Sequence, residues 1–132
     1  MLRLLLPGCV SCLLVASCSS PPAVPVVDSV SFPPFTRDAT GNYTATGTVA
    51  AHNDRGPVVA IAIDIPFQNG VAFAGQSTLV SGLTSPYSII ATMTAVPPGH
   101  IPPGSYIFDV TADGDDGADS ISPVFEYTVT VQ

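Results

Sequence analysis

The sequence predicts an all-β protein, an antiparallel β-sandwich of seven to eight strands. Apolar and polar residues alternate with a period of two in several segments, which is typical of strands that bury one face. Clusters of Gly, Pro, Asn and Asp separate these segments, as turn residues do. No window of useful length shows the periodicity of an amphipathic helix. We therefore expect short antiparallel strands joined by tight turns.

The first three strands follow from this alternation. We expect a strand at Val26–Phe32, which Pro33-Pro34 ends because proline cannot donate to a sheet ladder. Strands at Tyr43–His52 and Val58–Ile65 follow. The alternation predicts that one face of the second strand carries Tyr43, Ala45, Gly47, Val49 and Ala51, and that one face of the third carries Val59, Ile61, Ile63 and Ile65.

The second half of the chain continues the pattern. Short strands are expected at Val71–Gln76 and Thr78–Val80, and a strand that is apolar on both faces at Tyr87–Thr94. The last two expected strands are Tyr106–Ala112 and Val124–Val131. Their inward residues are predicted to be Tyr106, Phe108, Val110 and Ala112 in one strand and Phe125, Tyr127, Val129 and Val131 in the other.

The connections agree with a sandwich. Asn69-Gly70 between apolar runs predicts a two-residue hairpin turn, because both residues tolerate positive φ. His52–Gly56 is rich in turn residues and predicts a tight connection. Pro97–Gly104 contains Pro-Pro-Gly twice and predicts an ordered, extended crossover.

The first residues carry a targeting pattern. Val15-Ala16-Ser17-Cys18 follows Leu13-Leu14 and precedes two serines and two prolines. This segment resembles the lipobox of bacterial lipoprotein signal peptides. The resemblance implies a signal peptide at 1–17, a lipidated (palmitate-bearing) Cys18 that begins a proline-rich tether at 18–25, and a folded domain at 26–132. The alternative is an ordinary secretory signal in which Cys18 has no role.

The lipobox resemblance also implies a location. The protein is expected in the cell envelope, anchored to the membrane by its N-terminal lipid, at the outer membrane and facing the periplasm or the cell surface. The apolar leader is shorter than the roughly 20 residues that a membrane-spanning helix needs. All three cysteines lie at or before Cys18, so the domain has no disulfide framework and depends on its packed core.

The C-terminal third resembles a known family. Pro103–Asp113 and Phe125–Val131 look like the last two strands of bacterial immunoglobulin-like domains, in which a glycine turn leads into an aromatic strand and an alternating strand closes the sheet. The resemblance implies an immunoglobulin-like sandwich in which the Tyr106 hydroxyl bonds back to the main chain. The fold alone says little about function, because this scaffold carries unrelated activities.

Charge excludes one class of partner. The chain has no lysine, and residues 18–132 hold two arginines against nine aspartates and Glu126, a formal net charge of −8. Such a surface repels phosphate backbones, so we expect no nucleic-acid binding. It also has no basic patch for anionic lipid, so membrane contact is assigned to the lipid chains.

An acidic segment is the strongest candidate for metal binding. Asp113, Asp115, Asp116 and Asp119 lie within seven residues and carry the oxygen ligands that Ca²⁺ prefers. Their spacing departs from the EF-hand pattern, since the third acid comes one position early. The alternative is a solvated hairpin in which Asp and Gly satisfy turn geometry. Apart from possible Ca²⁺, no cofactor is expected.

The chain is poorly supplied for catalysis. His52 and His100 are its histidines and Glu126 is its one glutamate, and the fold should place the two histidines at opposite ends. We therefore expect no enzyme. If the first strand starts at the tethered end, the Asn53–Gly56 and Asp113–Asp119 turns share that end, and three other loops point away from the membrane.

Those distal loops are expected to contact a partner, an unidentified envelope protein or glycan. They are Thr36–Asn42, Pro66–Gly70 and Pro97–Gly104, and they present Phe67, His100 and Ile101 among prolines that pre-order the main chain. The sequence thus predicts a non-enzymatic binding or structural accessory module of the envelope. The alternative is a loop-mediated inhibitor or a calcium-binding accessory protein.

Overall fold

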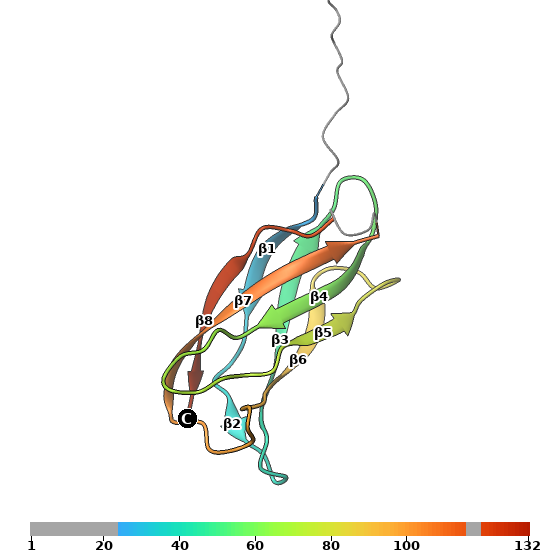
Figure 1. The fold of residues 1–132 in the computed structure, drawn as a ribbon. Coiled ribbons are helices and arrows are strands. Elements are labelled where there is room, and N and C mark those ends of the chain that lie inside the picture. The colour runs from blue at the N-terminus through green and yellow to red at the C-terminus, as the bar shows by residue number, and fades with distance from the viewer. Residues whose placement is uncertain (1–23, 116–119) are drawn as a thin grey trace, which may run out of the picture.

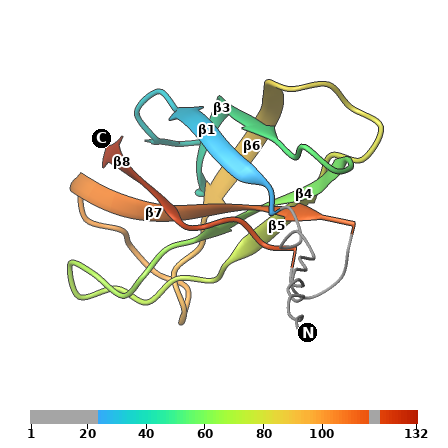
Figure 2. The same ribbon diagram turned by 90° about the horizontal axis from the view of Figure 1, so that it is seen from above.

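The computed structural model describes residues 24–115 and 120–132, which form eight strands and no helix. The strands make two packed antiparallel sheets, so the predicted β-sandwich is confirmed (Figures 1 and 2). In chain order they are β1 (Val26–Ser31), β2 (Thr36–Arg37), β3 (Tyr43–His52), β4 (Val58–Asp64), β5 (Gln76–Leu79), β6 (Tyr87–Met93), β7 (Gly104–Gly114) and β8 (Phe125–Val131). The expected signal peptide, Cys18 and the tether up to residue 23 lie outside the described residues.

Six strands begin and end within two residues of their expected bounds. The exceptions lie in the two regions where pairing is short. β2 has only two residues and was not expected, and Val71–Gln76 is no strand but makes isolated bridges at Val71 and Phe73. The strand β5 begins only at Gln76 and takes in most of the expected Thr78–Val80.

The two sheets have different strand orders. In one sheet β3 pairs with β1 and β2 on one side and with β6 on the other, and the second sheet has the order β5-β4-β7-β8. The chain passes from one sheet to the other between β3 and β4, between β5 and β6, and between β6 and β7. Figure 2 shows the two layers seen from above, with β1, β3 and β6 over β8, β7, β4 and β5.

A β-bulge changes the predicted face of β4. The pairing of β4 with β7 shifts by one residue between Val58 and Ala60, which leaves Val59 as the extra residue. Val58 therefore joins the core while Val59 is only half-buried. The prediction that Val59 shares a buried face with Ile61 and Ile63 is wrong for this reason, because alternation cannot reveal an inserted residue.

Aromatic rings tie the sheets together at the end of β1. The Phe32 ring lies 6.2 Å from Phe108 and 6.3 Å from Tyr127, and Phe35 lies 5.4 Å from Phe108. The ring of Phe32 packs over Gly47, where an added Cβ would lie only 2.4 Å from Phe32 Cδ1. Gly47 is therefore required in the middle of β3 because a larger residue has no space there.

The hydroxyl of Tyr106 forms the predicted bond to the main chain. Tyr106 is fully buried near the start of β7, and its hydroxyl donates to the carbonyl oxygen of Pro102 at 2.6 Å. This is the tyrosine corner of immunoglobulin-like sandwiches. It fixes the end of the Pro97–Gly104 crossover against the core.

The molecule has two distinct ends (Figure 1). The start of β1, the Asn53–Gly56 turn and Asp115 lie at one, called here the N-terminal end, where Asp115 Oδ1 approaches Gly56. The loops at 38–42, 66–70 and 97–103 lie at the other, called here the loop end. The predicted grouping of the described loops is therefore confirmed.

The tyrosine corner gives a test of this packing. Tyr106→Phe should lower the free energy of unfolding by about 1–2 kcal/mol, because the Pro102 carbonyl loses its partner. Urea denaturation should show a lower midpoint with an unchanged m-value. Tyr87→Phe is the matched control, since no hydrogen bond joins the Tyr87 hydroxyl to the described residues. Equal losses from both variants would contradict the role of the Pro102 bond.

Candidate functional site

The predicted site residues divide between the two ends. Asp113 is the last residue but one of β7, and Asp115 follows the strand at the N-terminal end, while Asp116, Asp119 and Cys18 lie outside the described residues. Within residues 24–115 and 120–132, no group of three or more His, Cys, Asp or Glu side chains is arranged to hold a metal ion. The four-carboxylate calcium site stays a prediction. In the same ranges, no helix is long and apolar enough to cross a membrane.

Phe67 lies on the loop end as expected. It is 72% exposed, next to the Asn69-Gly70 turn, whose residues have φ of 52° and 77°. Main-chain bonds from Gln68 N to Val71 O (3.1 Å) and from Val71 N to Gln68 O (2.9 Å) close the predicted hairpin. The aromatic ring therefore stands on an ordered turn.

Side-chain amides hold this turn against β7. Gln68 accepts a bond from Ile107 N at 2.7 Å and donates to Ile107 O at 2.9 Å, and Asn69 donates to Ser105 O at 3.0 Å. β4 ends before it reaches this part of β7, so the amides bond main-chain groups of β7 that a neighbouring strand would otherwise bond. The loop carrying Phe67 is therefore fixed to the sheet.

Ile101 does not have the predicted position. Its side chain is 1% exposed and belongs to the core, whereas its neighbour His100 is exposed. The crossover between β6 and β7 folds Ile101 inward because the Tyr106 hydroxyl holds Pro102 in place. Ile101 is thus not an exposed contact residue but part of the floor of a cavity.

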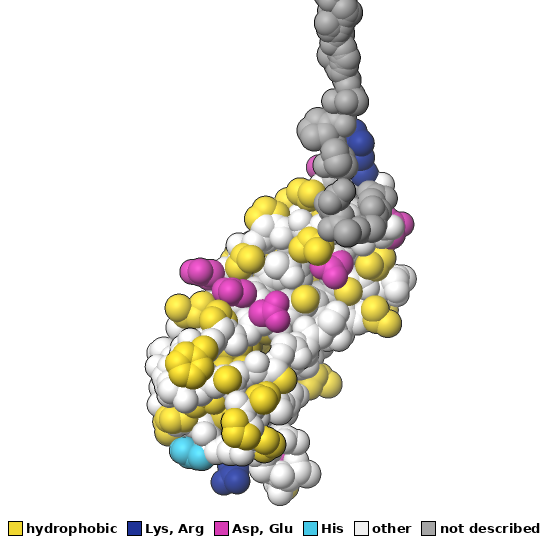
Figure 3. Space-filling view, viewed as in Figure 1, with side chains coloured by type: hydrophobic (Ala, Val, Ile, Leu, Met, Phe, Trp, Pro, Cys, Tyr) yellow, Lys and Arg dark blue, Asp and Glu magenta, His cyan; other side chains and the backbone are white. Residues whose placement is uncertain are grey.

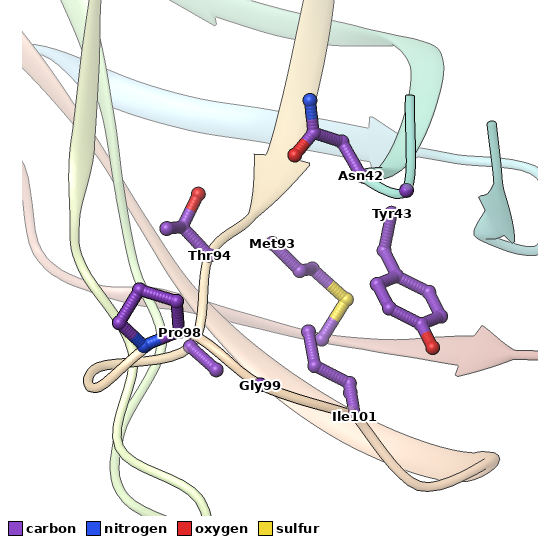
Figure 4. Close-up of a pocket in the computed structure, with 9 residues that line it drawn as sticks. Asn42, Tyr43, Met93, Thr94, Pro98, Gly99 and Ile101 are labelled. Carbon is purple, nitrogen blue, oxygen red and sulfur yellow. The ribbon is translucent and has the colours of Figure 1, made fainter. Parts of the chain in front are cut away.

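That cavity has a volume of about 110 Å³ and opens at the loop end. Its walls come from the β2–β3 loop, the end of β6 and the β6–β7 crossover (Figure 4). The lining residues are Gly41, Asn42, Tyr43, Met93, Thr94, Ala95, Pro98, Gly99 and Ile101.

The floor of the cavity is apolar and its rim is polar. Met93, Ala95 and Ile101 are buried, while Asn42 and Thr94 are exposed. Figure 4 shows the Met93 side chain between Thr94 and the Tyr43 ring, with Asn42 above it. A small apolar group with polar neighbours fits this environment.

The wall formed by the β2–β3 loop is held by one carboxylate. Asp38 Oδ1 accepts bonds from Thr40 N (2.9 Å), Thr40 Oγ1 (2.6 Å) and Asn42 N (2.9 Å). The bond from the Thr40 side chain, with the main-chain bonds, lowers the pKa of Asp38. This carboxylate is therefore directed into its own turn.

Arg37 and His100 each lie close to a residue that lines the cavity, although neither is part of the lining. Arg37 is the cross-strand partner of Tyr43, and its Nη2 lies 3.6 Å from the position of a Cβ on Gly41. Nδ1 of His100 lies 3.4 Å from the Tyr43 hydroxyl. Figure 3 shows a basic and a histidine side chain at this lower end of the molecule.

Acidic residues cover a different surface. Asp64 is paired with Asp109, and Asp109 with Glu126, so three carboxylates form one row across β4, β7 and β8. Figure 3 shows acidic side chains over this sheet. Oδ1 of Asp109 is buried and has no hydrogen-bond partner among the described residues. The charge of the domain is thus unevenly distributed, with its acidic row away from the cavity.

The second histidine lies far from the first. His52 ends β3 and donates from Nδ1 to Asp28 Oδ2 at 2.8 Å, whereas His100 contacts Tyr43 at the start of the same strand. The hydrogen bond with Asp28 and its charge raise the pKa of His52. The predicted separation of the histidines is confirmed, and they cannot act on one substrate group together.

Sequence reasoning missed the cavity. Tyr43 and Met93 were expected only as buried strand residues, and Arg37 was assigned no role. The cavity forms where the β2–β3 loop meets the β6–β7 crossover, and no local sequence pattern shows that these two segments come together. The sequence indicates each segment separately, as the polar Asp38–Asn42 turn and as the proline-rich crossover.

No protein-family model matches the chain, and no curated protein matches it. Its function is therefore inferred from its own residues and geometry.

The pair of His52 and Asp28 predicts a pH dependence. Because folding raises the pKa of His52 above its ordinary value of 6.5, the pair stabilises the fold below that pH and stops doing so as pH rises through the raised value. The stability gap between the wild type and His52→Gln should therefore be largest between about pH 5 and 6.5 and close by about pH 8–9.

Urea unfolding at several pH values measures this gap, and an NMR titration of His52 measures its pKa. In Asp28→Asn the titration should move back toward the ordinary value. A stability gap that does not change with pH would show that the contact contributes through packing only.

Proposed function

We propose that the protein is a lipid-anchored module of the cell envelope that binds a partner through the loop end of its sandwich and catalyses no reaction. Cys18 is its lipid-bearing residue in this proposal, and the envelope partner is a protein or a glycan. The observation that carries it is the position of the cavity and Phe67 at the end opposite the start of β1.

The distance between anchor and strand supports this geometry. Seven residues separate Cys18 from Val26, where β1 begins. The four residues between Cys18 and Ala23 are two serines and two prolines. An extended proline-rich segment rises about 3.1 Å per residue, so a segment of this length can reach on the order of 20 Å. The N-terminal end would then face the membrane and the loop end the envelope space.

The rigidity of the loop end supports binding. The three loops are held by the Tyr106 hydroxyl, by the Gln68 and Asn69 amides and by the Asp38 carboxylate. A surface that is ordered before binding loses less conformational entropy on association. Phe67 adds a large exposed aromatic ring, a residue type enriched at interfaces.

The positions of the histidines and of Asp38 favour binding over catalysis. The two histidines lie at opposite ends of β3, and His52 is already paired with Asp28. Asp38 is committed to its turn. A general base and a nucleophile within hydrogen-bond reach, which most hydrolytic chemistry requires, do not meet at the cavity among the described residues.

The anchor has a direct test. In cells grown with labelled palmitate, the wild type should carry label and sediment with membranes, whereas Cys18→Ser should carry none and lose membrane association. Cys12→Ser is the matched control, because it removes a leader cysteine outside the lipobox. Label retained by Cys18→Ser, or lost equally from Cys12→Ser, would overturn the assignment of Cys18.

The binding end has a separate test. A photo-crosslinking amino acid at position 67 should yield a discrete adduct in intact cells, and the same amino acid at position 55, at the N-terminal end, should not yield that adduct. Phe67→Ser should reduce co-purification of the captured partner at least several-fold without changing stability, because the ring is exposed. Equal adducts from both positions would contradict binding through the loop end.

A further inference from the structure

We propose that the cavity at the loop end binds the C-terminal residue of a partner polypeptide, with an aliphatic side chain inside and the α-carboxylate against Arg37. This inference rests on the proposed binding function and assigns its ligand class.

The size of the cavity fits one side chain. Its volume of about 110 Å³ compares with the roughly 150 Å³ of an engineered apolar cavity that holds benzene. Whole cofactors and drug-sized ligands need about 300 Å³ or more. One aliphatic side chain is therefore the largest group that enters fully.

The floor favours an aliphatic group. Met93, Ala95 and Ile101 are 2%, 6% and 1% exposed, and none of them offers a charged or hydroxyl group. Methionine adapts its shape to an inserted group. A polar side chain would lose its hydration here without a charged partner on the floor.

A positive charge lies next to the rim. Arg37 does not line the cavity itself, but its Nη2 lies 3.6 Å from the position of a Cβ on Gly41, which does, and no described carboxylate lies within ion-pair distance of its guanidinium group. The nearest acid in sequence, Asp38, uses one oxygen for three bonds within its own turn. The Arg37 fork can therefore bind a carboxylate with two parallel hydrogen bonds.

The rim also offers acceptors and donors for a peptide group. Asn42 Nδ2 donates to Thr40 Oγ1 at 3.2 Å, which leaves Oδ1 of the same side chain as an acceptor for a ligand N–H. His100 and the Tyr43 hydroxyl stand at the other edge. An amide, an apolar side chain and a carboxylate on adjacent atoms are what a peptide C terminus presents.

The charge of the whole chain argues against a ligand that carries several negative charges. The formal net charge of the sequence is −7, and the row of Asp64, Asp109 and Glu126 lies on the same domain. Polyanions such as nucleic acids or lipopolysaccharide phosphates would be repelled by this field. A C-terminal carboxylate meets Arg37 at the lowest electrostatic cost.

The test uses the acylated protein purified in detergent and fluorescein-labelled tetrapeptides Gly-Gly-Ala-Val, one with a free C-terminal carboxylate and one with a C-terminal amide. Fluorescence anisotropy should give saturable binding of the free acid, and the amide should bind at least about tenfold more weakly because it loses the charge-assisted bonds. A third peptide, Gly-Gly-Ala-Asp, should bind weakly because its side chain cannot enter the apolar floor.

Variants distinguish a direct contact between the ligand and Arg37 from a general effect of the protein's net charge. Arg37→Gln should weaken the free acid about tenfold and leave the amide unchanged, whereas Arg55→Gln, which changes net charge equally at the other end, should have no effect. Gly99→Leu should remove binding of both peptides by filling the mouth of the cavity, since no described atom except Pro97 O lies within 4 Å of a Cβ there.

Two results would overturn the inference: equal affinity for acid and amide, or equal loss from Arg37→Gln and Arg55→Gln. No saturable binding of any peptide, with circular dichroism showing a folded protein, would also overturn it. A discrete crosslink at position 67 combined with either result would leave the binding module in place and remove only this ligand class.

Discussion

The contact between Phe32 and Gly47 is the constraint on which the sandwich depends. Without a disulfide in the domain, the two sheets are held by packing, and the Phe32 ring occupies the place of a β3 side chain while touching Phe108 and Tyr127 of the other sheet. The Phe32 N–H also donates a hydrogen bond to the Tyr127 hydroxyl oxygen at 3.1 Å. Any larger residue at position 47 would push the Phe32 ring away from β7 and β8. Gly47 therefore sets the distance between the two sheets at this point.

The loops depend on a second interaction, in which side-chain amides bond main-chain groups that have no neighbouring strand. Gln68 bonds both main-chain groups of Ile107 where β4 has ended, and Gln76 does the same for the edge of β6, donating to Ile90 O and accepting from Thr92 N, both at 2.9 Å. These bonds satisfy groups that would otherwise need water or another chain. They cap two exposed edges and make the loop end an extension of the sheets rather than a set of free connections.

Most of the fold could be predicted from the sequence because the long strands alternate regularly. Tyr43–His52 has its expected faces, and the Tyr106 hydroxyl has its expected bond. Tyr87–Met93, expected to be apolar on both faces, buries only one of them and leaves Ile90 65% exposed. The failures have physical causes: the bulge at Val59 inserts a residue that alternation cannot show, and Val71–Gln76 crosses between sheets with only single bridges. The burial of Ile101 and the cavity arise from contacts between loops far apart in sequence, which local patterns do not encode.

The charged residues are unevenly distributed over the domain. Like charges directly opposite on neighbouring strands cost stability, yet Asp64, Asp109 and Glu126 stand in one row, and the two described arginines lie at opposite ends. If the chain is tethered at Cys18, an anionic membrane surface repels that acidic sheet within a Debye length of about 8 Å. Repulsion would then turn the β5-β4-β7-β8 face away from the lipid, whereas Arg37 at the loop end is held farther out by the length of the strands. In the proposed anchored form, a short tether and an acidic flank would therefore act in the same direction, since both would keep the cavity open toward the envelope space.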